Sequence, residues 1–424
     1  MLDIAMIRTH PDLVRQGLAR KGEPPTSVDN ILAIDERRRA MTTERDELRT
    51  RRNAISKEVG RIKSQGASAD QQMAESRRIG EAIKDLETHL ATVEEELSAA
   101  ALMVPNLPAD DVPDGKSPED NVVVKTVGDL PKLDFAPQAH WDLGARLGVL
   151  DLERGAKISG SGFCLFVGQG SRLVRALLNW MLDVHTGQHG YTEVWPPALV
   201  SARSMTGTGQ LPKFEQEMYR LRDDPYYLIP TAEVPVTNMY QDEILSEADL
   251  PILRTAYTPC FRREAGAAGR ETRGMIRVHQ FDKVELVKFT TPQSSPDEHE
   301  KLTRNAETLL ERLGLPYRRV LLCAGDMSFS SNKCWDLEVY AAGCGRWLEV
   351  SSCSNFGDFQ ARRANIRYRD SGGKVRFVHT LNGSGLALPR VFIAILENFQ
   401  QADGAVRIPE VLRPYMGGKE FLGK

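Results

Sequence analysis

The chain has 424 residues, more than one ordinary hydrophobic core accommodates, so two or three domains are expected. With 41% hydrophobic and 27% charged residues, its composition is that of a globular protein. A net charge of -3 argues against a protein that wraps nucleic acid over its whole surface, but it leaves room for a local basic surface. No run of about 18 apolar residues occurs, so no membrane-spanning helix is expected.

The N-terminus and the cysteines indicate the compartment. The first dozen residues include acidic and basic side chains and lack the apolar centre of a signal peptide. No cysteine belongs to a C-x-x-C pair, so neither a thiolate zinc site nor a disulfide framework is predicted. The six residues are Cys164, Cys260, Cys323, Cys334, Cys344 and Cys353. A reducing, cytoplasmic location is therefore expected.

Residues 30–102 are predicted to form two long helices. Apolar residues recur every seven positions in the first stretch, and at alternating steps of four and three in the second. Heptad spacing on both sides of a break at 64–68 predicts an antiparallel coiled coil with about 33 residues and roughly 50 Å per helix. The stripes are Ile34, Met41, Leu48, Ile55 and Ile62, and then Ile79, Ile83, Leu86, Leu90, Val93 and Leu97.

The first of these helices is rich in basic residues, which admits two interpretations. In one, long side chains cover the seam of an ordinary solvated coiled coil. In the other, the helix lies along an RNA or DNA backbone, because clustered arginine and lysine neutralise phosphates. Composition alone leaves both open. The residues are Arg37, Arg38, Arg39, Arg45, Arg49, Arg51, Arg52, Lys57, Arg61 and Lys63.

The rest of the chain predicts a mixed architecture. Pro105 and Pro108, with the acidic Asp110 and Asp111, end the second helix and begin a linker. From about residue 115 onward, short β-type runs mix with amphipathic helices, one of them at 170–185. Strands that cluster in sequence, without strict alternation with helices, favour an α+β fold with a mostly antiparallel sheet.

The segment 261–285 carries the most informative chemical signal. Its ends alternate like two strands around a Gly/Ala-rich middle, which predicts a long hairpin. Because a guanidinium binds two phosphate oxygens at once, a cluster of arginines suits a polyphosphate, although pairing with acids on a surface hairpin is the alternative. Neither a P-loop pattern nor a strand-led G-x-G-x-x-G is present. The arginines are Arg262, Arg263, Arg270, Arg273 and Arg277.

Three motifs resemble those of the class II aminoacyl-tRNA synthetases. Phe261-Arg262-x-Glu264 and the later run 277–281 (Arg-Val-His-Gln-Phe) resemble motif 2. The run 385–390 (Gly-Leu-Ala-Leu-Pro-Arg) resembles motif 3, and the helix before 190–197 resembles motif 1, the dimer-forming element. Each motif alone is degenerate, but the three in this order are far more specific.

Further segments narrow the resemblance to the seryl-tRNA synthetases, over essentially the whole chain. They are 206–214, 230–235, 349–355, 358–363 and 380–385. The resemblance implies an α+β class II catalytic domain at 111–424, built on an antiparallel sheet flanked by helices. An N-terminal tRNA-binding domain would precede it at 1–110, with its coiled-coil arm at about 30–102.

The resemblance also implies an ATP site. Arg262 would bind the α-phosphate and the serine carboxylate, Glu264 would contact the adenine amino group, and Phe281 would stack on the base. Arg390 and Arg277 would hold the outer phosphates. The full set implied for ATP is Arg262, Arg263, Glu264, Arg277, Val278, Phe281, Glu349, Val350, Ser351, Ser352 and Arg390.

A metal and an amino acid would join the nucleotide. Glu349 and Ser352 match the ligands of a magnesium ion, which prefers oxygen donors. Glu285 would face the amine and hydroxyl of serine. A polar pocket rejects alanine because it would leave buried groups unpaired, whereas threonine must be rejected by size. The serine set implied is Thr231, Ala232, Glu233, Arg262, Glu285, Asn382 and Ser384.

The reaction implied has two steps: ATP and L-serine give seryl-adenylate, and the seryl group then passes to tRNA. Arg262, Glu285 and Arg390 would carry catalysis by positioning and charge stabilisation, without a protein nucleophile. The implied partners are tRNA(Ser), by extension tRNA(Sec), and a second copy of the chain through motif 1. No membrane partner is expected.

Two other classes of protein are weighed against this one. A non-catalytic RNA-binding relative would have lost some of the key charged residues, yet Arg262, Glu285, Glu349 and Arg390 are all present. A relative that aminoacylates a carrier protein would lack the long arm. Two departures from the family pattern stand out: Pro389 replaces a usually small residue, and the wording of 324–336 differs in its second half.

Overall fold

The computed structural model describes residues 1–265 and 273–423. Backbone contacts divide the chain into two compact units, Leu2–Pro105 and Asn106–Lys424. None of the described helices combines the length and the apolar character that a membrane span requires.

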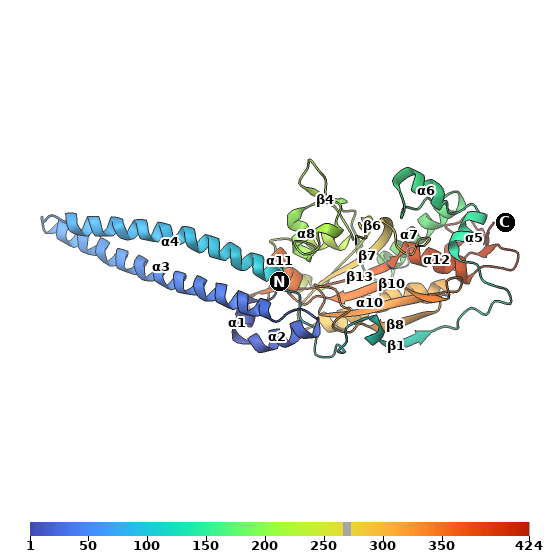
Figure 1. The fold of residues 1–424 in the computed structure, drawn as a ribbon, viewed down its shortest axis with the longest axis horizontal. Helices are drawn as coiled ribbons and strands as arrows, with labels where there is room; N and C mark the ends of the chain where they lie inside the picture. The colour runs from blue at the N-terminus through green and yellow to red at the C-terminus, as the bar shows by residue number, and fades with distance from the viewer. Residues whose placement is uncertain (266–272, 424) are drawn as a thin grey trace. The chain divides into compact units, whose positions relative to one another are not determined.

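The first unit is helical. The short helices α1 (Ile4–Thr9) and α2 (Pro11–Arg20) precede two long ones, α3 (Thr26–Ser64) and α4 (Asp70–Leu102). The long pair lies side by side in Figure 1 and is joined by a short turn at the predicted break. With 39 residues, α3 is about 58 Å long at ~1.5 Å per residue, longer than predicted because it begins at Thr26.

Heptad spacing predicted the seam between the long helices correctly. Ile55 of α3 forms one buried cluster with Ile79 and Ile83 of α4. Ion pairs cross the seam from three arginines of α3, and the partner's number falls as the arginine's number rises, so the helices are antiparallel. These pairs are Arg37–Glu96, Arg49–Glu87 and Arg51–Glu75, and their arginines are called the seam arginines below.

The second unit is built on an eight-stranded sheet in the order β1-β8-β9-β10-β13-β7-β6-β2. Every neighbouring pair is antiparallel except β2 with β6, which confirms the predicted α+β class. The strands are β1 (Val122–Val127), β2 (Thr192–Glu193), β6 (Ile252–Phe261), β7 (Gln280–Thr290), β8 (Tyr317–Leu321), β9 (Lys333–Ala341), β10 (Arg346–Asn355) and β13 (His379–Ala387).

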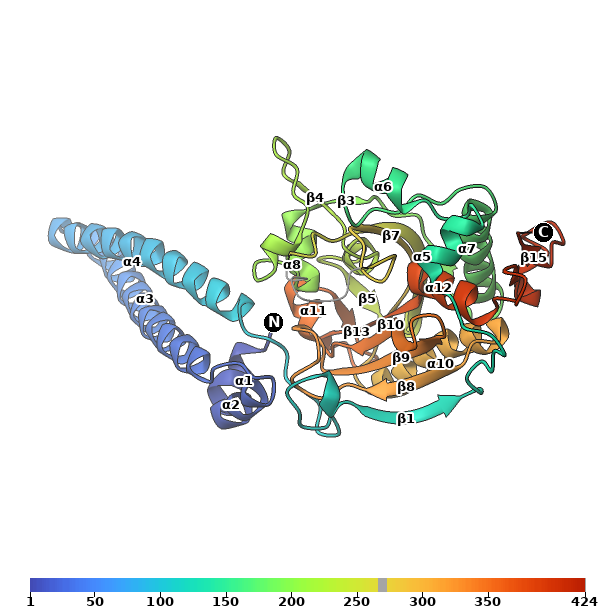
Figure 2. The ribbon, with the colours of Figure 1, turned by 45° about the vertical axis from the view of Figure 1, so that its right-hand side comes forward.

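The two faces of this sheet differ in character. On β7, Val284 and Leu286 point into the main core, which also holds residues of α7 (Gln169–Gly187), α10 (Ser295–Leu313) and α12 (Leu388–Asn398). Figure 2 shows α7 and α12 side by side, and the two helices are in contact. Successive side chains of a strand alternate between faces, so the residues between these core positions face the other way, where the site lies.

Smaller elements surround this sheet. The helices are α5 (His140–Arg146), α6 (Leu152–Ser159), α8 (Ala202–Thr208), α9 (Glu233–Asn238) and α11 (Phe359–Ala364). The strands are β3 (Leu199–Ser201) with β4 (Tyr226–Leu228), β5 (Ile244–Ser246) with β11 (Arg367–Arg369) and β12 (Val375–Phe377), and β14 (Val406–Arg407) with β15 (Phe421–Leu422).

Candidate active site

A cavity of about 790 Å³ lies on the face of the sheet that the main core leaves open. Its walls come from β7, β10 and β13, from the start of α12, and from the segments that flank β6 and β7. The predicted site residues that line it are Thr231, Glu233, Arg262, Glu264, Arg277, Val278, Phe281, Glu285, Glu349, Ser352, Asn382, Ser384 and Arg390.

Four predicted residues do not line the cavity. Ala232 and Val350 are fully buried in apolar cores. Ser351 is buried, and its hydroxyl donates to the carbonyl of Ser384 at 2.7 Å. Arg263 donates to the carbonyl of Gln216 at 3.0 Å. Three of these side chains therefore lie within the protein behind the cavity, and the fourth, Arg263, lies on the surface outside it.

One end of the cavity is small and polar. The hydroxyl of Thr231 donates to Glu285 Oε2 at 3.0 Å and accepts from Lys283 Nζ at 2.9 Å. Lys283 also forms an ion pair with Glu285, and both side chains are almost fully buried. Lys283 was missed from the sequence, although it lies between Phe281 and Glu285 on the same face of β7, where period-2 alternation could have found it.

Glu233 lies at this polar end and is unusually easy to protonate. Burial raises its pKa to about 7, and the charge of Glu285 adds to the effect. The amide of Gln360 donates to Glu233 Oε1 at 2.6 Å, while its oxygen accepts from the hydroxyl of Thr380 at 2.7 Å. Because both ends of the amide are used, Gln360 holds Glu233 in one orientation. It is the second residue that sequence reasoning missed.

Residues of the segment 324–336, whose sequence departs from the family pattern, also line the cavity although they were not predicted. Ser328, Phe329 and Ser330 line the cavity. The hydroxyl of Ser330 donates to the carbonyl of Thr208 at 3.2 Å, which ties this segment to the end of α8. The segment was noted only as a departure, and no pattern in it signalled a place at the site.

Arg262 is held by its neighbours on several sides. Its guanidinium lies over the ring of Phe281, 5.1 Å from the centroid, and its Nε donates to the carbonyl of Pro230 at 3.4 Å. Its backbone N–H donates to the carbonyl of His279 at 2.9 Å, and His279 Nδ1 contacts the carbonyl of Arg262 at 3.1 Å. His279 therefore supports the backbone of Arg262, consistent with a structural role for this histidine.

The other two arginines that line the cavity form ion pairs with carboxylates. Arg277 pairs with Glu264 at 3.2 Å, and Arg390 pairs with Glu349 at 3.4 Å. All four side chains are partly exposed, so a phosphate could take the place of either carboxylate. Pro389 fits in the first turn of α12, where a backbone N–H has no helical partner to lose.

Glu349 and Ser352 reach the cavity because β10 is irregular. Three positions apart, they would face opposite ways on a regular strand, but a register shift between Glu349 and Ser351 brings both to the site face. Beside them, burial and the charge of Glu349 raise the pKa of Asp336 well above its ordinary value. Carboxyl and hydroxyl oxygens are the donors that a hard divalent cation such as magnesium prefers.

The remaining sequence expectations concern cysteines and arginines. All six cysteines are free, and burial raises the pKa of the Cys353 thiol to about 12, so this thiol is not a poised nucleophile. Arg270 and the middle of the predicted hairpin lie outside the described residues. The described ends of that hairpin are β6 and β7, which pair from Ile252 with Phe289 to Phe261 with Gln280.

Sequence comparison places both units in known families. Residues 213–399 match the family described as tRNA synthetase class II core domain (G, H, P, S and T). Residues 1–108 match the seryl-tRNA synthetase N-terminal domain. The chain is 50% identical over 425 residues to the serine--tRNA ligase of Clostridium tetani, a match that covers 100% of both chains.

Solved structures agree with the sequence matches. The fold is similar to that of seryl-tRNA synthetase from Pyrococcus horikoshii, crystallised with ATP, with a TM-score of 0.94, 39% identity and coverage of 100% of this chain and 99% of that one. Cytoplasmic serine-tRNA ligase from Naegleria fowleri, in complex with AMP, gives a TM-score of 0.90 and 30% identity, covering 100% and 98%. The chain therefore belongs to the seryl-tRNA synthetase family.

Proposed function

We propose that the cavity activates L-serine with ATP and that the seryl group then passes to the 3′ end of tRNA(Ser). The observation that carries the proposal is that one cavity on the sheet face is lined both by a buried polar group around Thr231 and Glu285 and by Arg262, Arg277 and Arg390. A relative with the same fold was crystallised with ATP, which supports a nucleotide at the arginine end. The polar end is then left for an amino acid.

In the first step, a carboxylate oxygen of serine attacks the α-phosphorus of ATP, and the bond from that phosphorus to the leaving pyrophosphate breaks. Negative charge grows on the phosphoryl oxygens as this happens. Arg262 lines the cavity with its guanidinium over Phe281 and beside Pro230, next to Thr231 in sequence, and it would hold the α-phosphate and the serine carboxylate together. Arg277 and Arg390 would exchange their carboxylate partners for the outer phosphates.

Serine would be recognised by charge and by hydrogen bonds at the polar end. The ammonium would lie against Glu233 and Glu285, and the hydroxyl would reach the same acceptors. Alanine would leave these buried groups without a partner, which is the costly kind of mismatch. Asn382 and Ser384 complete the wall on β13.

Glu349 and Ser352 would hold a magnesium ion in the nucleotide channel. When bound, the ion supplies positive charge that offsets the charge of the phosphates. The protein's own contribution at this point is the irregularity of β10, which directs both oxygen donors into the cavity.

In the second step, a hydroxyl of the terminal ribose of tRNA attacks the carbonyl carbon of seryl-adenylate, and AMP leaves. We assign tRNA binding to the domain at residues 1–110 and catalysis to 111–424, and we extend the substrate range to tRNA(Sec) where such a tRNA exists. A homodimer through motif 1 and a cytoplasmic location complete the proposal, the latter consistent with six free cysteines.

Pyrophosphate exchange across a panel of amino acids tests the activation step. Exchange should be fastest with serine, and a faster rate with any other amino acid would overturn the assignment. Replacing Arg262 with alanine should lower the exchange rate by about 100-fold or more, as loss of a charge-stabilising group does. Arg263→Ala is the matched control. The guanidinium of Arg263 is next to Arg262 in sequence but donates to the carbonyl of Gln216 outside the cavity, so its loss should change the exchange rate little.

A further inference from the structure

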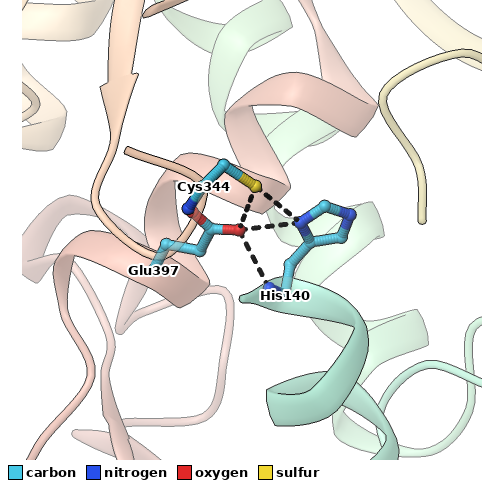
Figure 3. A group of neighbouring side chains, drawn as sticks. All are labelled: His140, Cys344 and Glu397. Carbon is cyan, nitrogen blue, oxygen red and sulfur yellow. Dashed lines mark hydrogen bonds and ion pairs between the residues drawn. The ribbon is translucent and has the colours of Figure 1, made fainter. Parts of the chain in front are cut away.

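Three side chains outside the cavity meet in the core of the second unit, as Figure 3 shows. His140 begins α5, Glu397 lies on α12, and Cys344 lies in the turn between β9 and β10. His140 Nδ1 is 2.7 Å from Glu397 Oε1, and the thiol of Cys344 is 3.2 Å from the same oxygen. His140 and Glu397 are completely buried.

The hydrogen bonds determine where the proton of His140 lies. The backbone N–H of Met275 donates to His140 Nε2 at 3.0 Å, so this nitrogen carries a lone pair. The neutral imidazole must then carry its proton on Nδ1 and donate it to Glu397. The Glu397 carboxylate also accepts the backbone N–H groups of His140 and Cys344, each at 2.9 Å. Burial alone would raise the pKa of Glu397, but the bonds from His140 lower it below its ordinary value.

The same three residues have the composition of a metal site, and their ligand atoms lie within 4.8 Å of one another. A metal on Nδ1 would displace the proton from that nitrogen, and the proton of the neutral ring would move to Nε2. Two N–H groups, of Met275 and of His140, would then face each other across 3.0 Å. The arrangement therefore favours a closed hydrogen-bond network over a bound metal.

This network reaches the wall of the cavity. Met275 and Ile276 both line it, and Arg277 follows them directly. The carbonyl of Ile276 accepts from Arg390 Nε at 3.4 Å. Arg390 and Glu397 are seven residues apart on α12, or about two helical turns, so they lie on one face of that helix. The 275–276 segment is thus tied to this face at two points, by Arg390 directly and by Glu397 through His140.

Gly274 shows how closely the segment fits against α5. Its φ of +70° favours glycine, and a Cβ added there would lie 2.1 Å from His140 Nε2 and 2.8 Å from the Trp141 ring. The guanidinium of Arg273 lies over that ring, 4.4 Å from its centroid. Residues 273–276 therefore pack on the first turn of α5.

We infer that His140 is a positioning residue for nucleotide binding: backed by Glu397, it fixes the peptide N–H of Met275 and so the approach of Arg277 to the phosphates. The inference rests on the proposed function for its ligand, ATP. The contact between His140 and Met275 does not depend on that function.

Two substitutions distinguish the role of Nδ1, which donates to Glu397, from that of Nε2, which accepts from Met275. His140→Asn keeps a donor near Glu397 but leaves the N–H of Met275 without an acceptor. His140→Gln places an amide oxygen where Nε2 was and restores that acceptor. In pyrophosphate exchange, H140N should raise KM for ATP by about tenfold, with KM for serine within about twofold of wild type, and H140Q should recover most of the loss. Hydrogen exchange at the Met275 amide should accelerate in H140N and not in H140Q.

Cys344→Ala is the matched control, because its thiol contacts the same carboxylate on the Nδ1 side of the ring, whereas Nε2 accepts from Met275. Its KM for ATP should stay within about twofold of wild type. Equal ATP KM values in wild type and H140N would overturn the inference, as would losses in all parameters that H140Q does not rescue. A metal content near one per chain, lost in C344A, would also overturn it. An inactive wild-type enzyme would instead contradict the proposed function, and the Met275 exchange rates would still test the contact.

Discussion

At the scale of single residues, Glu233 links the site to pH. Its pKa of about 7 means that the carboxyl is charged above that pH and gains a proton below it. If the ammonium of serine lies against this carboxylate, KM for serine should rise as pH falls through 7, by up to about tenfold per unit. Glu233→Gln should have a high KM at pH 8 and lose this pH dependence. The check is KM for serine at saturating ATP from pH 6 to 8.5.

The same shift affects stability with a defined sign. In the unfolded chain Glu233 titrates near 4.5, so between 4.5 and 7 the folded protein binds a proton that the unfolded chain releases. Its contribution to the free energy of unfolding must therefore fall as pH rises through that window. E233Q should remove that part of the slope, and an unchanged slope would mean that Glu233 titrates normally in the fold.

Lys283 supplies positive charge to both carboxylates of the polar end, through an ion pair with Glu285 and through its nearby charge for Glu233. Replacing it with methionine would leave Glu285 buried without its ion pair, which typically costs about 3–5 kcal/mol of unfolding free energy. Lys283→Met paired with Glu285→Gln should cost less than the sum of the two single changes, because the second removes the stranded charge. Denaturant unfolding of the four proteins measures this cycle. Strict additivity would show that the pair is not coupled.

At the scale of elements, strand irregularities decide what the sequence could and could not predict. A regular β10 would place Glu349 and Ser352 on opposite faces, and only the observed register shift brings both into the cavity. A second shift, between Ser384 and Ala387 on β13, does the same for those two residues. Period-2 reasoning cannot find such positions. The resemblance to a family supplied Glu349, Ser352 and Ser384, but not Ala387.

At other positions the resemblance was the weaker guide to the site. Lys283 lies on the site face of β7 by simple alternation, and the resemblance did not supply it. Val350 was included because it lies inside a matched run, but its side chain points into the core. Gln360 comes from α11, 127 residues from Glu233 along the chain, and only the folded chain brings the two side chains together. A motif thus identifies the segments that form the site, and the backbone conformation of each segment determines which of its side chains face the cavity.

The arm offers an element-scale test of its two interpretations. The seam arginines are occupied by ion pairs, whereas no ion-pair partner exists in the described part of the chain for Lys57, Arg61 and Lys63, the tip cations of α3. Replacing the tip cations with alanine should weaken tRNA charging. It should also lower the salt dependence of tRNA binding, by roughly one unit of slope for each phosphate that the variant no longer neutralises. Pyrophosphate exchange should not change.

Alanine at the seam arginines is the matched control, with the same loss of charge. It should lower the thermal stability of the arm slightly, because exposed ion pairs contribute little. It should leave the salt slope of tRNA binding near the wild-type value. Equal effects of the two triple variants would favour the plain coiled-coil interpretation of the basic helix.

At the scale of the whole molecule, heptad spacing and the break between the stripes were enough to predict the antiparallel helical pair, and the clustering of strands in sequence was enough to predict a mostly antiparallel sheet. Both depend on local patterns that repeat, such as the seam at Ile55, Ile79 and Ile83. The supporting network of His140, Glu397 and Met275 could not be predicted. Its members are separated by more than 100 residues, and each looks ordinary in its own segment.

The proposed homodimer is the last whole-molecule feature to test, and Trp195 is the residue to change. It lies two residues after the edge strand β2, in the run 190–197 that follows the motif 1 helix, and its side chain is 78% exposed. We propose that this exposed ring beside the edge strand packs against the second copy. Trp195→Glu would place a charge there and should shift the sedimenting species from about twice the 47.3 kDa chain mass to a single chain at micromolar concentration. Ile158→Glu, at a position that is 71% exposed on α6 and outside that run, should leave the dimer intact.

A wild-type chain that sediments as a monomer would contradict the proposed assembly, and a dimer unaffected by W195E would place the interface elsewhere.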